Sequence, residues 1–264
     1  MFIGHFAVGF AAKKYAPRTS LASLLAAPLL SDLLWPWFLL FGWERVRIDP
    51  GSTRFVPLDL EYFPWSHSLL MCVVWATAFA LIYHLVAHYW QGTVAIWIGV
   101  LSHWVLDWIT HRPDMPLYPG GQRFGLGLWN SVAGTMAVEI TMLVLGVWLY
   151  VRTTKPRDRI GRYAFAVYVA LLFVLYVADY FGSPPSGTSE IISSGIPFEF
   201  VALVWAWWFD RHRVPFRFFP AIARSPGSAP PTPILRWGNI PSFGCKANWA
   251  MHPAPPTTAP PLRL

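Results

Sequence analysis

The sequence predicts an all-α membrane protein, a polytopic transmembrane helix bundle with about six spans and an N-terminal half-helix. Of its 264 residues, 55% are hydrophobic and only 12% are charged. Soluble domains carry about 25% charged residues. The charges also gather in short clusters between long apolar runs, so lipid is expected to cover most of the surface. The alternative class is a very apolar soluble α-protein.

The elements follow from the apolar runs, because a membrane-spanning helix needs about 20 predominantly apolar residues. Six runs predict spans, at residues 21–43, 67–89, 93–110, 126–151, 163–182 and 191–209. The run at residues 2–12 is too short to span, so it predicts a half-helix or an interfacial helix. Residues 1–217 are therefore expected to form one transmembrane domain.

The remaining residues, 218–264, are rich in Pro, Ala, Ser and Thr. Such a composition does not support a packed helix. We expect a disordered tail outside the bilayer.

The basic residues predict the orientation. Lys13, Lys14 and Arg18 precede the first predicted span, and further basic clusters occupy residues 152–162 and 211–217. All three clusters fall on one side if every span crosses the membrane. The positive-inside rule then places both termini in the cytoplasm. The net charge of +7 is explained by this topology, so no nucleic-acid partner is expected.

Ionisable residues at apolar depth are the candidates for function, because each is costly in a bilayer unless it is paired or hydrated. The candidates are His5, Asp32, His67, His103, Asp107 and Glu139, with Asp179 and Glu199 as weaker ones. Such side chains are also ligands of zinc, manganese and iron. The set therefore predicts a divalent metal ion, with zinc preferred over manganese or iron.

The sharpest local pattern is the H-x-x-x-D formed by His103 and Asp107. This spacing places both side chains on one face of a helix, within reach of a single ion. His111 continues the same stripe by one more turn. Alone, the pair also fits helix capping or a simple hydrogen bond between its two members.

Depth in the membrane strengthens the metal hypothesis. If residues 2–16 and 21–43 form a helical hairpin, His5 and Asp32 each lie ~20 Å from its turn. His103, Asp107 and Glu139 reach similar depths by the same count. His67 lies ~37 Å along its helix from the turn near Gly92, which places it near the far interface of the membrane. Either the segment before it dips inward, or Ser66 caps the helix and His67 meets water.

Four sequence elements resemble a known family. They are Gly4-His5-Phe6, Ala27-Pro28-Leu29-Leu30-Ser31-Asp32, Trp65-Ser66-His67-Ser68-Leu69 and Ser102-His103-Trp104-Val105-Leu106-Asp107. In this order they resemble the bacterial inner-membrane proteins of the YdjM-like group, a family of predicted metal-dependent hydrolases. His111-Arg112-Pro113-Asp114 and Glu139 are similar to one branch. The resemblance covers roughly residues 1–150.

The resemblance implies a site and a location. The proposed metal ligands of the family correspond to His5, Asp32, His67, His103 and Asp107. The family often has a second acidic residue two positions after the Asp, where this chain has Leu34, so fewer ions are expected here. The family also implies a multi-pass protein of the bacterial inner membrane.

Three functions remain open. The first is a membrane-embedded metal-dependent hydrolase acting on a lipid-like phosphate or acyl ester, with the metal activating water. In it, Glu139 is the candidate general base or a support for the ligands, His111 is a second catalytic candidate, and Arg112 would meet a substrate phosphate. The second is a transporter with a cation or proton path past Asp32 and Glu139 to both faces. The third is a structural membrane protein whose polar cluster locks the helices together. The substrate and the oligomeric state do not follow from the sequence.

Overall fold

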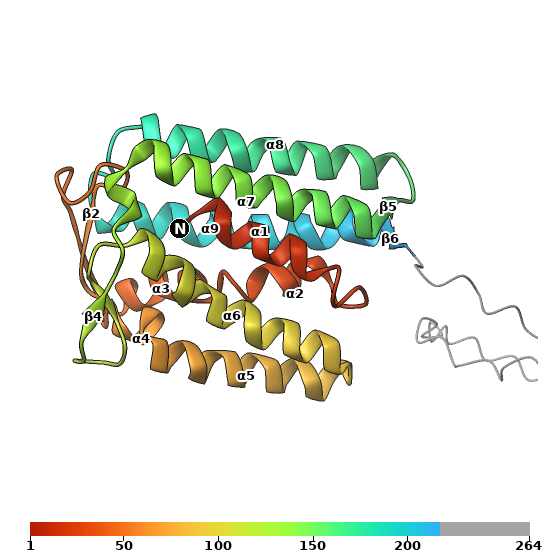
Figure 1. Cartoon of the computed structure of the whole chain (residues 1–264), viewed down its shortest axis with the longest axis horizontal. Helices are drawn as coiled ribbons and strands as arrows, with labels where there is room; N and C mark the ends of the chain where they lie inside the picture. The colour runs from red at the N-terminus through yellow and green to blue at the C-terminus, as the bar shows by residue number, and fades with distance from the viewer. Residues whose placement is uncertain (217–264) are drawn as a thin grey trace, which may run out of the picture. The chain divides into compact units, whose positions relative to one another are not determined.

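The computed structural model describes residues 1–216. The predicted tail, residues 218–264, lies outside the described residues. Within residues 1–216 the helices run along one common direction and form a bundle (Figure 1). The predicted fold class, an all-α membrane bundle, is confirmed.

Five long helices make up most of the bundle. They are α5 (Leu69–Ala87), α6 (Trp90–Thr110), α7 (Val132–Thr153), α8 (Arg159–Phe181) and α9 (Thr188–Arg211). Each is long and apolar enough to cross a membrane. They match the last five predicted spans, with ends that differ by a few residues.

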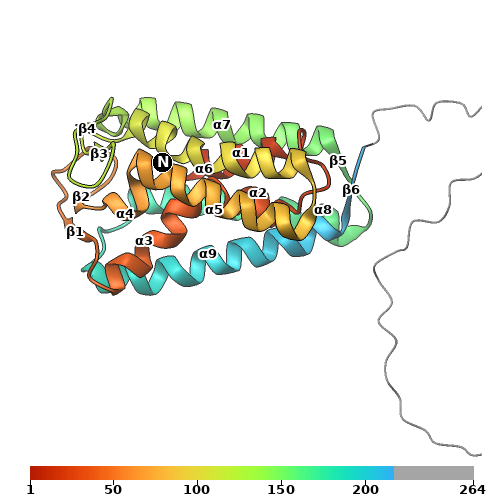
Figure 2. The same ribbon diagram turned by 90° about the horizontal axis from the view of Figure 1, so that it is seen from below.

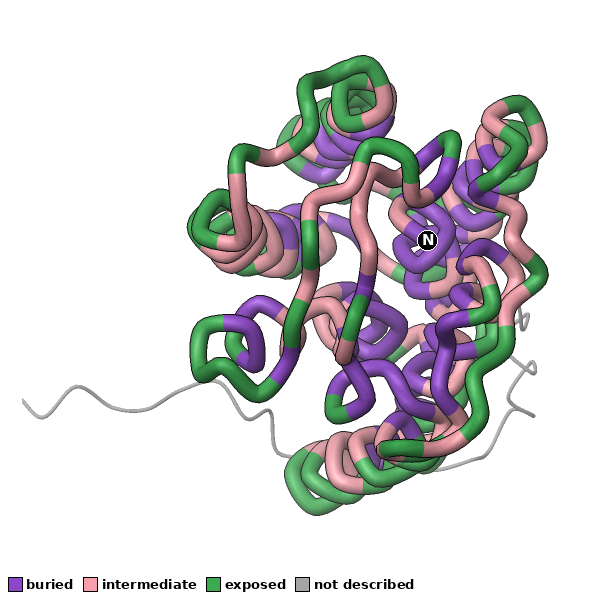
Figure 3. Tube along the Cα trace, turned by 90° about the vertical axis from the view of Figure 1, so that its left-hand side faces the viewer, coloured by how far each residue is buried: buried purple, intermediate pink, exposed green. Residues whose placement is uncertain are grey.

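The outer surface of these helices is apolar. Leu85 and Val86 on α5 are 63% and 80% exposed, and Phe200 on α9 is 68% exposed. Seen from one end, the buried residues lie on the inward sides of the helices and the exposed ones on the outward sides (Figure 3). A contiguous apolar surface of this extent is typical of contact with lipid.

The first predicted span, residues 21–43, is wrong as a single helix. It consists of α2 (Leu21–Ala26) and α3 (Leu30–Leu40), separated by a turn at residues 27–29. Pro28 explains the break, because proline has no backbone N–H to donate to the carbonyl of Leu24 one turn earlier, although Ala27 before it keeps helical geometry. The predicted half-helix is α1 (Ile3–Ala12), which at ~1.5 Å per residue covers about half of a bilayer core.

The short α1 is held inside the bundle by close backbone contacts. A Cβ atom on Gly146 of α7 would lie 2.4 Å from the carbonyl oxygen of Ala7, and one on Gly9 would lie 2.8 Å from that of Leu24. Only glycine permits such an approach between membrane helices. Phe6 and Phe10 of α1 are buried in the largest apolar core cluster of the described residues.

Three two-stranded antiparallel sheets, which the sequence analysis did not predict, close the ends of the bundle. Their strands are β1 (Arg45–Ile48) with β2 (Leu58–Tyr62), β3 (Met115–Pro116) with β4 (Arg123–Phe124), and β5 (Thr154–Pro156) with β6 (Arg213–Pro215). We call the end with β1 to β4 the hairpin end. The opposite end, with β5 and β6, is the basic end (Figure 1).

The remaining helices are short and lie near the hairpin end. They are α4 (Pro64–His67) and the 3-10 helix η1 (Leu128–Asn130). Turned by 90°, the bundle shows α9 running beside α2 and α3 (Figure 2). Met1 is buried within the bundle, and the predicted cytoplasmic location of both termini stays a prediction.

Candidate metal centre

Four helices bring the predicted ligands together in the half of the bundle nearer the hairpin end. His5 comes from α1, Asp32 from α3, His67 from α4, and the pair His103 and Asp107 from α6. His111 follows α6 directly and joins them. We call the His–Asp cluster these six residues: His5, Asp32, His67, His103, Asp107 and His111.

Asp107 lies at the centre of the His–Asp cluster and is almost completely buried. Its Oδ1 is 3.1 Å from His5 Nε2, and its Oδ2 is 3.0 Å from His103 Nε2. The Nε2 atoms of His111 and His67 lie 3.6 and 3.9 Å from the same Oδ2. All four imidazoles therefore turn the same ring nitrogen towards one carboxylate.

Asp32 supplies the second carboxylate. Its Oδ1 is 3.5 Å from His67 Nε2 and 4.0 Å from His103 Nε2, and its Oδ2 is 4.0 Å from His5 Nε2. Two triads, His5 with His103 and Asp107, and Asp32 with His67 and His103, each place their ligand atoms within 4.8 Å of one another. His103 is common to both.

His67 reaches the cluster because the segment before α5 dips inward. Pro64 starts α4 as a separate short helix, which ends at His67. The predicted alternative, with Ser66 as the helix cap and His67 in water, is wrong. Ser68 caps α5 by accepting from the Met71 N–H at 3.3 Å, and His67 is only 5% exposed.

Hydrogen bonds at the far ring nitrogens define the state of two histidines. His103 Nδ1 is 2.8 Å from the carbonyl oxygen of Pro28, and His111 Nδ1 is 3.0 Å from Asp114 Oδ1. Both partners only accept, so each Nδ1 carries the proton and donates it. In the neutral imidazole, Nε2 then carries a lone pair, and that lone pair faces the carboxylates.

His5 differs from its neighbours in this respect. Its ring stacks on that of His103 with centroids 4.1 Å apart, and its Nδ1 is buried without a hydrogen-bond partner. The amino group of Met1 donates to Asp107 Oδ1 at 2.6 Å, on the side of the carboxylate that His5 faces. The packing of α1 therefore determines the position of His5.

The chemistry of these donors fits a divalent cation. Ligands bound to one ion at about 2.0–2.2 Å lie about 3–3.5 Å apart, close to the shorter nitrogen–oxygen separations in the cluster. His103 Nε2 is fully buried without a hydrogen-bond partner. In residues 1–216 no Lys or Arg side chain forms an ion pair with Asp32 or Asp107.

Glu139, predicted as a general base or a support for the ligands, contacts the start of α1. Its Oε2 accepts from the backbone N–H of Phe2 at 2.9 Å and of Gly4 at 3.2 Å. The first N–H groups of a helix have no partner within the helix, so a buried carboxylate there stabilises it. The structure places Glu139 behind the helix that carries His5, and outside the residues that line the cavity described below.

Arg112, predicted to bind a substrate phosphate, contacts carboxylates of the protein. Its guanidinium donates to Asp59 on β2, and to Asp114 at 3.1 Å. Arg47 on β1 also donates to Asp59, and Arg47 together with Arg112 holds the pKa of Asp59 below its usual value. Arg112 therefore ties the β1–β2 hairpin to the end of α6.

A cavity of about 680 Å³ opens beside the His–Asp cluster. Asp32, His67, Asp107 and His111 form one polar part of its wall. Most of the rest is apolar and comes from α1, α3, β2, α8 and α9, with Phe2, Trp35, Leu58, Leu175 and Phe198 among the lining residues. Asp179 and Glu199, the weaker candidates, line its wall on α8 and α9.

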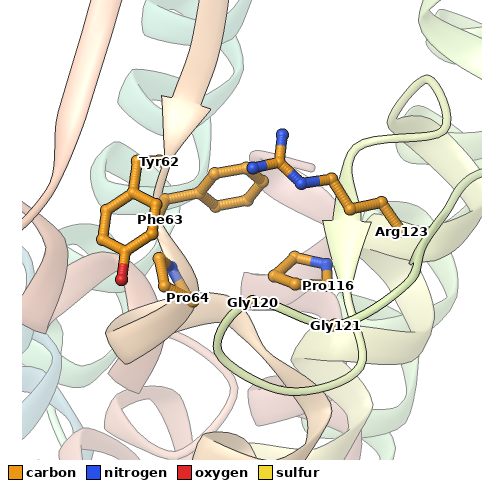
Figure 4. Close-up of a pocket in the computed structure, with 7 residues that line it drawn as sticks. All are labelled: Tyr62, Phe63, Pro64, Pro116, Gly120, Gly121 and Arg123. Atoms are coloured by element: carbon orange, nitrogen blue, oxygen red, sulfur yellow. The ribbon is translucent and has the colours of Figure 1, made fainter.

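A second, smaller pocket of about 130 Å³ lies nearby at the hairpin end (Figure 4). Tyr62, Phe63, Pro64, Pro116, Gly120, Gly121 and Arg123 line it. The ring of Phe63 lies 5.3 Å from that of His67 and 6.0 Å from that of His111. Phe63 therefore lies between this pocket and the His–Asp cluster.

Sequence reasoning missed the residues that hold the histidines from behind. Asp114 and the Pro28 carbonyl are two of them, and Glu44, which accepts from Ser66, is another. Burial raises the pKa of Glu44, and the nearby His67 and the hydrogen bonds from Ser66 oppose that rise. A backbone carbonyl carries no sequence signal, and Glu44 lies 22 residues before Ser66.

Comparison with known proteins identifies the middle of the chain. No curated protein and no solved structure gives a significant match. The model of one family, the YdjM inner membrane protein, matches residues 64–182. The match includes His67, His103, Asp107, His111 and Glu139, and it begins after His5 and Asp32. The resemblance is thus confirmed over a segment: residues 64–182 match the YdjM inner membrane protein family.

Proposed function

We propose that this protein is a membrane-embedded, metal-dependent hydrolase that acts on a phosphate or acyl ester of a lipid-like molecule. His5, Asp32, His67, His103 and Asp107 would hold a divalent ion, with zinc preferred. The basic end would face the cytoplasm of the cell, as the positive-inside rule predicts. The hairpin end, with the His–Asp cluster and its cavity, would then lie towards the opposite face.

One observation carries this proposal. Four imidazoles direct Nε2 towards two carboxylates, and the hydrogen bonds of His103 and His111 leave the Nε2 lone pair free. Lone pairs and carboxylate oxygens at such distances repel one another unless a proton or a cation lies between them; the Met1 amino group faces only Asp107 Oδ1, and a metal ion would supply the positive charge for the remaining ligand atoms. Metal-binding histidines usually donate their other ring nitrogen to an acceptor in this manner.

The residues of the chain then have distinct roles. A bound divalent ion would polarise the ester oxygen and lower the pKa of water towards neutrality. His111 lines the cavity with its Nδ1 held by Asp114, and in this proposal its Nε2 would take a proton from the attacking water and return it to the leaving oxygen. Glu139 would act through α1, by holding the helix that carries His5.

The cavity supports the substrate class. Its volume of about 680 Å³ lies within the range of ligand sites, about 300–1,000 Å³. Its polar wall would accommodate an ester headgroup next to the ligands, and apolar side chains on α8 and α9, such as Leu175 and Phe198, would accommodate a hydrocarbon chain. We expect long-chain esters to be hydrolysed faster than short-chain esters with the same headgroup.

Metal content tests the proposal. Protein purified in detergent without chelators is analysed by elemental mass spectrometry, beside the double variant His103→Ala/Asp107→Ala. We expect near-stoichiometric zinc, manganese or iron in the wild type and almost none in the variant. His84→Ala is the matched control, because His84 is also on a membrane helix but contacts Thr93 at 3.1 Å.

A folded wild type that remains free of metal after zinc, manganese and iron are added back would overturn the proposal. The same holds if His103→Ala/Asp107→Ala keeps its metal. Size-exclusion chromatography shows which samples are folded. If the metal-loaded wild type cleaves neither lipid phosphate esters nor acyl esters, the metal site would be supported and the hydrolase activity would be contradicted.

A further inference from the structure

Glu44 is a buried carboxylate at the hairpin end that the proposed function does not use. It lies just after α3 and is 2% exposed. Its two oxygens both accept from Ser66: Oε1 from the backbone N–H at 2.8 Å, and Oε2 from the hydroxyl at 2.6 Å. A carboxylate held by two donors of one residue fixes the orientation of that residue.

The same hydroxyl of Ser66 also contacts His67. Ser66 Oγ and His67 Nδ1 lie 2.6 Å apart. A serine hydroxyl has a single proton, and a carboxylate only accepts. When the hydroxyl donates to Glu44, it must accept from Nδ1–H of His67. The remaining nitrogen, Nε2, then presents a lone pair 3.5 Å from Asp32 Oδ1.

We propose that Glu44, acting through the Ser66 hydroxyl, is a positioning residue that fixes the tautomer and orientation of His67 for metal binding. The inference rests on the proposed metal site. The Ser66 hydroxyl then accepts from His67 Nδ1, just as the Pro28 carbonyl accepts from His103 Nδ1 and Asp114 Oδ1 accepts from His111 Nδ1. In three histidines of the His–Asp cluster, Nδ1 then donates a hydrogen bond, each to a different partner, and Nε2 keeps its lone pair.

Glu44→Gln is the sharpest variant, because it keeps the size of the side chain and changes its donors. The amide oxygen accepts from the Ser66 N–H, so the amide NH₂ faces the Ser66 hydroxyl and donates to it. The hydroxyl then turns and donates to His67 Nδ1. Nε2 becomes the protonated nitrogen and loses its lone pair. Ser66→Ala removes the connection altogether.

Two measurements test the inference. Zinc titration against a competing chelator should show about 10–100-fold weaker binding in Glu44→Gln and Ser66→Ala, the usual effect of removing such a partner. Ser68→Ala is the matched control: Ser68 is equally buried, but its hydroxyl caps α5 by accepting from the Met71 N–H. We expect this control to lose stability and keep its zinc affinity.

The second measurement is ¹⁵N NMR of histidine-labelled, metal-free protein, with the His67 signal assigned from its loss in His67→Ala. We expect Nδ1 to carry the proton in the wild type and Nε2 to carry it in Glu44→Gln. An unchanged tautomer, or unchanged zinc affinity in Glu44→Gln, would overturn the inference. Because the tautomer is read without metal, a wild type that binds no zinc contradicts the proposed function separately.

Discussion

Two buried polar clusters of this protein differ in how their charges are balanced. At the basic end, Asp210 accepts from Lys13 Nζ at 2.6 Å, from the Tyr150 hydroxyl at 2.8 Å and from the Leu21 N–H at 3.0 Å. Lys13 also donates to the Thr19 carbonyl at 2.8 Å. We call this group the Lys13–Asp210 cluster. Its acceptors all face donors.

The His–Asp cluster is arranged in the opposite way. Its carboxylates face the Nε2 lone pairs of His103 and His111, and in addition Asp107 accepts from the Met1 amino group. The difference shows that buried charged residues in one membrane protein can have two roles, one in holding helices together and one in a candidate binding site. The Lys13–Asp210 cluster is complete and holds α1 and α9 together, whereas the proposed metal ion would complete the His–Asp cluster.

The largest expected effect tests the Lys13–Asp210 cluster. Lys13→Met should lower the free energy of unfolding by about 3–5 kcal/mol, because it leaves a buried carboxylate without its cation. Denaturant titration in mild detergent measures the loss. The adjacent, exposed Lys14→Met is the control and should change little. Equal stability of the two variants would show that the ion pair is not structural.

The next effect tests the His–Asp cluster. Zinc at 100 times its dissociation constant should raise the free energy of unfolding by about 2.7 kcal/mol, because it binds only the folded protein. Lys13→Met should show the same increment. His103→Ala/Asp107→Ala should show none, and an equal increment in that variant would mean that zinc acts elsewhere.

A third, smaller effect joins the two clusters through α1. Gly146→Ala places a Cβ 2.4 Å from the Ala7 carbonyl and should cost about 1–3 kcal/mol as α1 moves away. The shift should also weaken zinc binding, since α1 carries His5. Gly195→Ala is the control, because its nearest contact, Pro36 Cγ, is an ordinary 3.4 Å away. If Gly146→Ala and Gly195→Ala bind zinc with equal affinity, the position of α1 does not affect zinc binding.

The smallest effect concerns the hairpin beside the site. Asp59→Asn should cost no more than about 1 kcal/mol, because Arg47 is largely exposed and its ion pair is screened by solvent. The Asp59 pKa is lowered by folding, so its contribution is present above the ordinary value of 3.8 and is lost as pH falls through the lowered value. The measurement is the protection factor of the β1 and β2 amides, which is the intrinsic exchange rate at a given pH divided by the observed rate. It should be lower in Asp59→Asn than in the wild type at neutral pH, and the wild type should lose the difference only in acid. A wild-type protection factor that is equal at both pH values would contradict this.

The helices were predictable because length and hydropathy specify them locally. The last five spans follow from apolar runs of about 20 residues. The break between α2 and α3 was not predicted, although Pro28 marks it, because a proline is also tolerated inside a membrane helix, as Pro36 is in α3. Hydropathy averaged over a window does not distinguish a proline that breaks a helix, such as Pro28, from one that lies inside a helix, such as Pro36.

The candidate ligands were easier to find than their supports. A histidine or aspartate in an apolar run is unusual by itself, so His5, Asp32, His103 and Asp107 were visible in the sequence. The partner of a histidine Nδ1 is set by tertiary packing: Pro28 lies 75 residues from His103. Arg112 shows the same limit, because its partner Asp59 lies 53 residues away.

The short α1 also has a consequence for how the protein is made. It precedes α7 in the chain but packs on it, and α7, which begins at residue 132, leaves the ribosome on the order of ten seconds after α1. Too short to span the bilayer alone, α1 reaches its full packing only after α7 has been made. The position of His5, which α1 carries, is therefore settled late, shortly before α8 and α9 complete the wall of the cavity.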